Sequence, residues 1–576
     1  MTTDVDIRAA APLEIEDLGV RYPGRREPAL DGVTVSVAAG EQVGIAGRTG
    51  AGKSTLALAA AGFVPRVVRA TLDGRVTVDG QDAATATGGA LLGRVGIIFA
   101  TPANQLSASK LTVREELAFG LENLGVPRDE MDRRIEATLE RLSIRHLADR
   151  EPFALSGGEQ QRVAIASIVA MGTRVLVLDE PTAQLDPAGT VSVTDLLDEL
   201  ARAGSAVLCA AHDPTVIGRM DQLVVLDAGR TIALDTPGAA LMAAETAGGP
   251  PSPTLVRLAD AAGLPPERAF DEEAIAGALA ARAAVGGLRE RSDPSPPMTN
   301  WRPHPDRASV RVAFEDVVHR YPTGIEAVRG VSLTIEPGEA VAILGQNGSG
   351  KTTLVKHLNG LLRPASGRIL LDGRDTADRS IADLAATVGF VFQNPDEQLF
   401  ERSVEREVSF GPRNLKVPSA EIAARVTASL EAVGLTDQRA TNPYDLDLSR
   451  RKLVALAGIL AMDPAVLVLD EPTTGQDAEG VVRVGEVVEA IRAAGRSVVA
   501  ITHDMEFAAT RFGRIVVMRD GVVVADGPPG VVFAPANRDL LASTGLTPPP
   551  AARIAARMGL TAVPLDARQL LAAASP

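Results

Sequence analysis

Two short segments of the chain have the residue types and the spacing needed to hold a phosphate group. Residues 47–54 read Gly-Arg-Thr-Gly-Ala-Gly-Lys-Ser, and residues 345–352 read Gly-Gln-Asn-Gly-Ser-Gly-Lys-Thr. Each segment follows an apolar run, precedes a stretch of helical composition and satisfies the pattern G-x-x-x-x-G-K-[ST]. The glycines let backbone N–H groups converge on phosphate oxygens at a helix N-terminus, where the helix dipole favours an anion. The sequence therefore predicts two phosphate-binding loops.

Each predicted loop ends in a lysine and a hydroxyl residue that have separate roles. The lysines are expected to reach the β and γ phosphates of a nucleotide, and the hydroxyls of Ser54 and Thr352 to bind Mg²⁺. ATP and Mg²⁺ are thus the expected cofactors. The loop residues expected to bind the nucleotide are Gly47, Gly50, Gly52, Lys53, Ser54 and Thr55, with Gly345, Gly348, Gly350, Lys351, Thr352 and Thr353 in the second loop.

Further along each half, an apolar run ends in two adjacent acids. The first acid is expected to hold Mg²⁺, and the second to polarise the water that attacks the γ-phosphate. These pairs are Asp179 with Glu180, and Asp470 with Glu471. A histidine that follows a later apolar run is expected to hydrogen-bond the γ-phosphate, and the two histidines are His212 and His503.

A tyrosine precedes each phosphate loop at nearly the same distance. Tyr22 lies 31 residues before Lys53 (53 − 22), and Tyr321 lies 30 residues before Lys351 (351 − 321). A tyrosine ring can stack on adenine. The repeated spacing predicts that both tyrosines contact the nucleotide base.

The motifs recur in the same order, which indicates an internal duplication. The two lysines are 298 residues apart (351 − 53), and the first acids of the two pairs are 291 apart (470 − 179). Short apolar runs alternate with helical stretches in both copies, as is typical of an α/β domain with buried parallel strands. We expect two tandem α/β domains, each with its own parallel sheet.

Proline-rich segments mark the expected boundaries between these domains. We expect a first nucleotide-binding domain over residues 1–247, a Pro- and Ala-rich linker with a short helical module over 248–305, a second nucleotide-binding domain over 306–535, and a small C-terminal module or tail over 536–576.

Composition limits the partners and the location of the chain. A net charge of −15 over 576 residues argues against nucleic acid as a partner, because phosphate backbones need a basic surface. Cys209 is the only cysteine, which excludes an internal disulfide and fits a reducing cytoplasm. The N-terminus does not resemble a signal peptide, and no run approaches the roughly 18 to 20 apolar residues of a spanning helix. Work at a membrane would therefore require a docking partner.

Residues 155–162, Leu-Ser-Gly-Gly-Glu-Gln-Gln-Arg, resemble the signature motif of ABC ATPases. This resemblance implies that Ser156, Gly157 and Gly158 contact the nucleotide, and that each domain has a helical subdomain. It also implies a pseudo-dimer within one chain, in which each ATP lies between the phosphate loop of one half and the signature of the other. The family's D-loops are matched by residues 183–186 and 474–477.

Residues 392–400, Phe-Gln-Asn-Pro-Asp-Glu-Gln-Leu-Phe, resemble the Q-loop of energy-coupling factor (ECF) transporter ATPases. Residues 408–415 and 117–124 are similar to the segments that follow it in that group. The resemblance implies that Gln393 binds Mg²⁺ and assists catalysis, and that residues 394–400 dock on a membrane subunit. It implies a peripheral position at the cytoplasmic face of the membrane, with a transmembrane coupling protein and a substrate-capture subunit as partners. The cargo is expected to be a vitamin, a vitamin precursor, or a cobalt or nickel ion.

Both halves depart from the family pattern at one motif. Ala100 stands where the first half should have the Q-loop glutamine, and Asp447, Leu448 and Ser449 replace the serine and two glycines of the second signature. In the family's head-to-tail pairing both departures serve the ATP held by Lys53, so that site is expected to be impaired. The spared site is expected to combine Lys351, Thr352, Gln393, Asp470, Glu471 and His503 with Ser156, Gly157 and Gly158.

Two other functions share this architecture. One is the fused ATPase of a sugar importer, for which residues 394–400 give no support. The other is a soluble ABC-F translation factor, which should have a long charged helical linker and two sound signatures. The linker here is rich in Pro, Ala and Gly, and one signature is altered.

Overall fold

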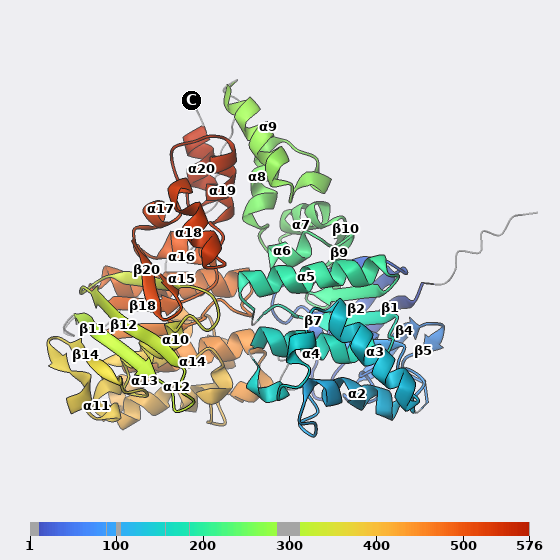
Figure 1. Cartoon of the computed structure of the whole chain (residues 1–576), viewed down its shortest axis with the longest axis horizontal. Helices are drawn as coiled ribbons and strands as arrows, with labels where there is room; N and C mark the ends of the chain where they lie inside the picture. Colours follow the sequence, from blue (N-terminus) through green and yellow to red (C-terminus); the bar gives the residue numbers. More distant parts are fainter. Residues whose placement is uncertain are drawn as a thin grey trace, which may run out of the picture. The chain divides into compact units, whose positions relative to one another are not determined.

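A computed structural model describes residues 11–87, 89–99, 105–155, 157–183, 185–284 and 311–574. The chain divides into two compact units (Figure 1). The first comprises Met1–Val256 with Pro265–Phe270, and the second comprises Arg257–Leu264 with Asp271–Pro576. In the part of the chain that the structure describes, no helix is both long enough and apolar enough to cross a membrane.

The first unit contains a six-stranded sheet in the order β10-β9-β3-β8-β7-β6 and a four-stranded antiparallel sheet in the order β2-β1-β4-β5. In the larger sheet β6, β7, β8, β3 and β9 are parallel, and β10 pairs antiparallel with β9. The strands are β1 Leu13–Arg21, β2 Leu30–Val37, β3 Gln42–Gly47, β4 Thr71–Val78, β5 Gln81–Asp82, β6 Val95–Ile98, β7 Val175–Asp179, β8 Ala206–Ala210, β9 Gln222–Asp227 and β10 Arg230–Asp235.

Helices connect these strands. Between β6 and β7 the chain forms the helical part of the unit, α2 Val113–Asn123, α3 Arg128–Arg141 and α4 Gly157–Ala170. The other helices are α1 Lys53–Ala60, α5 Pro187–Arg202, α6 Pro214–Ile217, α7 Pro237–Thr246 and α8 Thr254–Ala262, of which the last crosses the boundary between the two units.

The second unit repeats this plan. Its six-stranded sheet has the order β16-β17-β18-β13-β19-β20, with only β20 antiparallel, and its four-stranded sheet has the order β12-β11-β14-β15. The strands are β11 Val312–Arg320, β12 Glu326–Ile335, β13 Ala340–Leu344, β14 Ser366–Leu371, β15 Arg374–Asp375, β16 Val388–Val391, β17 Val466–Asp470, β18 Ser497–Ile501, β19 Arg514–Arg519 and β20 Val522–Gly527.

The helices of the second unit follow the same order and continue to the C-terminus. They are α9 Glu272–Ala284, α10 Lys351–Val355, α11 Ile381–Ala385, α12 Val404–Asn414, α13 Ser419–Ala432, α14 Leu448–Met462, α15 Ala478–Ala493, α16 Met505–Arg511, α17 Pro529–Val532, α18 Arg538–Ser543, α19 Pro550–Arg557 and α20 Ala567–Ala574. Helix α9, which precedes the second domain in sequence, packs on α19.

The burial and composition of the central strands explain why they form parallel sheets. Every residue of β3, β8, β13, β17 and β18 is buried, and most are Val, Leu, Ile or Ala. Strands covered on both faces read as continuous apolar runs, because neither face meets water. The predicted fold class, two tandem α/β domains each with a parallel sheet and a helical part, is confirmed.

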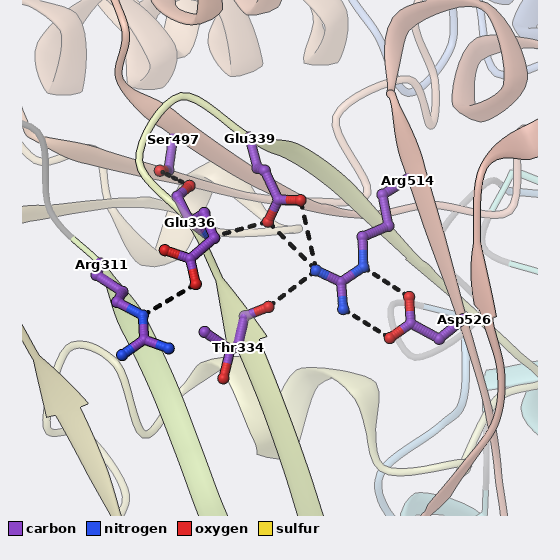
Figure 2. Close-up of polar contacts among 7 residues, drawn as sticks. All are labelled: Arg311, Thr334, Glu336, Glu339, Ser497, Arg514 and Asp526. Atoms are coloured by element: carbon purple, nitrogen blue, oxygen red, sulfur yellow. Dashed lines mark hydrogen bonds and ion pairs between the residues drawn. The ribbon is translucent and has the colours of Figure 1, made fainter.

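In the second unit, Arg514 on β19 joins the two sheets (Figure 2). Its guanidinium forms two hydrogen bonds of 2.6 Å with the carboxylate of Asp526 on β20, and its Nη1 donates to the backbone oxygen of Thr334 on β12 at 2.9 Å. Glu339 accepts from the same nitrogen at 3.2 Å and from the backbone N–H of Glu336 at 2.8 Å. Bidentate contacts of this kind fix geometry as well as adding energy.

A buried ion pair supports the end of α14. Arg496 is 1% exposed and pairs with Asp463, which ends α14 in the left-handed conformation at φ 58°. The Arg496 guanidinium also donates to the backbone oxygen of Pro464 at 3.2 Å. Gly172 and Ser205 occupy the equivalent positions of the first unit, so this pair belongs to the second unit alone.

We expect Asp463→Asn to destabilise the second unit by about 3 kcal/mol, because removing one partner leaves a buried charge uncompensated. Asparagine tolerates the left-handed backbone, so the loss reports the charge rather than the turn. Urea unfolding followed by circular dichroism measures this change. The double variant Asp463→Asn with Arg496→Met should recover part of the loss, and an unchanged unfolding midpoint in the single variant would contradict the prediction.

Candidate functional site

The phosphate loop of the second unit connects β13 to α10 and requires glycine at two positions. Gly345 has φ 149° and Gly350 has φ 97°. A Cβ atom at Gly345 would lie 2.2 Å from the backbone oxygen of Met518, and one at Gly350 would lie 2.2 Å from that of Ala327. Only glycine fits so close to another backbone. The loop 47–54 connects β3 to α1 in the same way.

The lysine of each loop is buried against its own backbone. Lys351 Nζ donates to the backbone oxygens of Gly345 at 2.6 Å and Gln346 at 2.7 Å, and Lys351 is 5% exposed. Lys53 Nζ donates to the equivalent oxygens of Gly47 and Arg48 at 3.0 and 3.1 Å. Both ammonium groups therefore lie at the loop that the sequence predicts to bind the β and γ phosphates.

The paired acids lie at the carboxyl end of the strand beside the loop. In the second unit Thr352 Oγ1 donates to Asp470 Oδ1 at 3.4 Å, and both acids are buried. Burial raises the pKa of Asp470 to about 6 and that of Glu471 to about 7, although the charge of Lys351 opposes the rise at Glu471. Buried carboxylates next to a hydroxyl form a cluster of hard oxygen donors.

The first unit has the same pair of acids. Burial raises the pKa of Asp179, while a hydrogen bond from Ser54 lowers it. Burial also raises the pKa of Glu180 to about 8, against the charge of Lys53. Asp179 Oδ1 has no hydrogen-bond partner among the described residues. An unsatisfied buried carboxylate oxygen beside a hydroxyl fits a Mg²⁺ ligand, so Ser54 with Asp179 and Thr352 with Asp470 are suited to hold this ion.

The two predicted histidines contact the second acid of each pair. His503 Nε2 lies 3.2 Å from Glu471 Oε1 and 3.2 Å from Asn347 Oδ1 in the phosphate loop. His212 Nε2 lies 3.2 Å from Glu180 Oε1. Glu180 and Glu471 have φ 54° and 49°, a conformation that costs a non-glycine residue about 1 kcal/mol or more. Both acids thus combine a strained backbone conformation with a close contact to a histidine.

Each predicted tyrosine contacts the threonine that follows Ser54 or Thr352, the hydroxyl residue at the end of its phosphate loop. Tyr22 donates to Thr55 Oγ1 at 3.2 Å, and Tyr321 Oη lies 3.0 Å from Thr353 Oγ1. The structure therefore brings the proposed base-stacking residue of each half to the start of its phosphate-loop helix.

Tyr321 has an additional support. The ring of His319 packs edge-on against it, with centroids 4.7 Å apart, and His319 Nδ1 lies 3.1 Å from His357 Nε2. Burial lowers the pKa of His357 to about 4, so this histidine is neutral at neutral pH. Val20 and Ala59 occupy the equivalent positions of the first unit.

The two signature segments differ in what lies at the helix N-terminus. Helix α4 begins at Gly157, where an added Cβ would have open space, and Gly158 follows. Helix α14 begins instead after Asp447, whose carboxylate accepts from the backbone N–H of Arg450 at 2.9 Å. The chain thus places its own anion at the helix N-terminus. Ser156 and Ala100 lie outside the described residues.

The Q-loop follows β16, whose carboxyl end adjoins that of β17. Gln393 is exposed there, and among the described residues its amide forms no hydrogen bond to Thr352 or Asp470. Gln398 points inward, because its Oε1 accepts from the backbone N–H of Phe392 at 3.3 Å. The exposed part of residues 394–400 includes Asp396, which pairs with Arg451 at 2.6 Å, and Phe400.

Sequence reasoning missed two residues that contact Glu471. Lys452 is 6% exposed, and its Nζ donates to the backbone oxygen of Glu471 at 3.0 Å. Burial lowers the pKa of Lys452 to about 8. Thr474 Oγ1 donates to Glu471 Oε2 at 3.4 Å. The sequence contains a signal for Lys452, because it is a lysine within the largely apolar helix 448–462. A charged residue is rarely buried there without a partner.

Comparison with known proteins agrees with this geometry. The model of the family described as "ABC transporter" matches residues 30–183 and 328–474. A putative ABC transporter ATP-binding protein of Methanosarcina acetivorans is 38% identical over 575 residues, covering 97% of this chain and 92% of the relative. One of Streptomyces coelicolor is 35% identical over 571 residues, covering 95% and 98%.

A solved structure also matches part of the chain. It is cbiO1 from Clostridium perfringens, described as part of the ABC transporter complex cbiONQ. It is 38% identical, covers 40% of this chain and 93% of its own, and has a TM-score of 0.37.

The family matches coincide with the two phosphate loops, the paired acids and the signature segment. Proteins of this family bind and hydrolyse ATP, and they work together with membrane transporter subunits. The chain belongs to the ABC transporter family, as an ATP-hydrolysing subunit with two ATP-binding domains in tandem.

Proposed function

We propose that this protein is the motor of an ECF-type importer, docked at the cytoplasmic face of the membrane on a transmembrane coupling protein. The substrate-capture subunit would bring a vitamin, a vitamin precursor, or a cobalt or nickel ion. Support comes from residues 392–400, which have the ECF-like sequence and lie at the sheet edge that carries Glu471.

We also propose the domain limits 1–247, 248–305, 306–535 and 536–576.

The contact between Glu471 and His503 beside the phosphate loop is the observation that carries the catalytic part of the proposal. Lys351 would bind the β and γ phosphates, and Tyr321 would stack on the base. Thr352 and Asp470, with Gln393, would hold Mg²⁺, which neutralises phosphate charge when it is bound. Glu471 would accept the proton of the attacking water, and His503 would contact the γ-phosphate. In the first half, Lys53, Asp179, Glu180, His212 and Tyr22 would have the same roles.

We propose that the two ATP sites are unequal. In the head-to-tail pairing of the family, the ATP held by Lys53 would meet the altered signature of the second half. The carboxylate of Asp447 already occupies that helix N-terminus, where it would repel a γ-phosphate. The ATP held by Lys351 would meet Gly157 and Gly158, together with Ser156. Most turnover would therefore take place at the site of Glu471.

We expect Glu471→Gln to lower the steady-state ATPase rate of the assembled transporter by about 10²- to 10⁴-fold, because it removes the group that activates water. Glu180→Gln should retain much of the wild-type rate. The two variants are matched, since each acid lies 3.2 Å from the histidine of its own half. Equal losses in the two variants would show that the sites are equivalent.

Docking through residues 394–400 predicts a separate effect for Phe400, which is 56% exposed beside Phe410. Phe400→Asp should reduce co-purification with the membrane subunits by about tenfold or more, since losing a buried aromatic contact typically costs 2 kcal/mol or more. The ATPase rate of the isolated protein should remain unchanged. Val531→Asp, at an exposed apolar position on α17, is the control, and equal loss in both variants would argue against this docking surface.

A further inference from the structure

The helix with the altered signature makes three buried hydrogen bonds to the loop that carries Glu471. Ser449 Oγ donates to Gln476 Oε1 at 2.6 Å, and Gln476 Nε2 donates back to the backbone oxygen of Ser449 at 3.3 Å. Lys452, one turn further along α14, donates to the backbone oxygen of Glu471 at 3.0 Å. Ser449, Gln476 and Lys452 are 3%, 5% and 6% exposed, so water competes little for these bonds.

The first unit has other residues at all three positions. Gly158, Leu185 and Gln161 are each 291 residues before Ser449, Gln476 and Lys452, which is also the separation of Asp179 and Asp470. A Cβ at Gly158 would lie 3.6 Å from Leu185 Cδ2, so that contact is apolar. Gln161 is 1% exposed, and its Nε2 has no hydrogen-bond partner among the described residues.

The substitutions in the second unit are complementary. Serine stands in place of a signature glycine and glutamine in place of the D-loop leucine, so a hydroxyl and an amide occur together where they can bond to each other. The two residues lie 27 residues apart in sequence (476 − 449), and their bonds join the start of α14 to the loop after β17.

The loop that these bonds hold needs support. Glu471 has φ 49°, a strained conformation that persists only where its surroundings fix it. Lys452 fixes its backbone oxygen, and Thr474, which replaces Ala183 of the first unit, donates to its carboxylate at 3.4 Å. Gln476 lies two residues beyond Thr474, so its bond to Ser449 anchors the far end of the same loop.

We propose that α14 has exchanged the nucleotide contact of a signature helix for a new role, which is to position Glu471 within its own half. Ser449, Gln476 and Lys452 are positioning residues, because they act on the loop and not on ATP. The inference rests on the proposed role of Glu471. A displacement of about 1 Å in a reacting group can lower a rate by about 10²-fold, so small movements of this loop are sufficient to matter.

The test replaces the bonded pair by the residues of the first unit, in the variant Ser449→Gly with Gln476→Leu. We expect kcat for ATP hydrolysis by the assembled transporter to fall by about tenfold or more, with little change in the KM for ATP. The two single variants should each lose about as much as the double variant, since either one breaks the bond. Gly458→Ser is the matched control, because it introduces the first unit's Ser167 on the same helix in open space and should leave kcat unchanged.

Lys452→Gln, which introduces the first unit's residue, tests the bond from Lys452 to Glu471 separately and should also lower kcat with little change in KM. Thermal unfolding of each variant gives the folded fraction, and kcat is expressed per folded molecule. Unchanged kcat in the paired variant and in Lys452→Gln would overturn the proposal, and so would a fall in kcat/KM that comes from a higher KM alone. Glu471→Gln is measured in parallel. If Glu471→Gln abolishes turnover while the variants of Ser449, Gln476 and Lys452 retain it, only the positioning role of α14 is rejected. Retained turnover in Glu471→Gln rejects the proposed function instead.

Discussion

The alignment of parallel strands is the constraint on which the rest of each unit depends. In the second unit β13, β18 and β17 are neighbours that run in the same direction, so their carboxyl ends meet at one edge of the sheet. The phosphate loop, His503 and Glu471 each follow one of these strands. Backbone hydrogen bonds between the strands therefore set the distances from the phosphate loop to Glu471 and His503, which lie 120 and 152 residues beyond Lys351 (471 − 351 and 503 − 351).

The two units show how one scaffold can support different sites. Both keep the lysine, the paired acids and the histidine in nearly the same geometry. They differ around this common set, since the second unit adds polar contacts at His319, Ser449 and Lys452 where the first has Val20, Gly158 and Gln161. Each addition is buried, so its bonds are shielded from water and fix the groups they join.

Sequence alone was sufficient for the fold and the family, because glycine loops, apolar strands and terminal acids are local patterns. The contacts of Tyr22 with Thr55 and of Tyr321 with Thr353 also agree with the predicted spacing. The bond between Ser449 and Gln476 could not be predicted in this way, because it depends on how α14 packs on the loop after β17. The inward orientation of Gln398 could not be predicted either, because a polar residue in a loop is expected to face water. Only the fold brings its side chain to the backbone N–H of Phe392.

The helix α9 has a consequence for how the chain can be divided. Glu272 at its start accepts from Arg553 Nε at 2.9 Å and from Arg557 Nη2 at 3.2 Å, both on α19, so α9 belongs to the unit that ends the chain. A cut near residue 306, where sequence composition suggests a boundary, would leave α9 on the wrong fragment and expose the face of α19 that it covers. A cut before residue 257 would in turn remove Pro265–Phe270 from the first unit, and a cut after residue 270 would remove Arg257–Leu264 from the second. A single cut therefore cannot divide the chain into its two units.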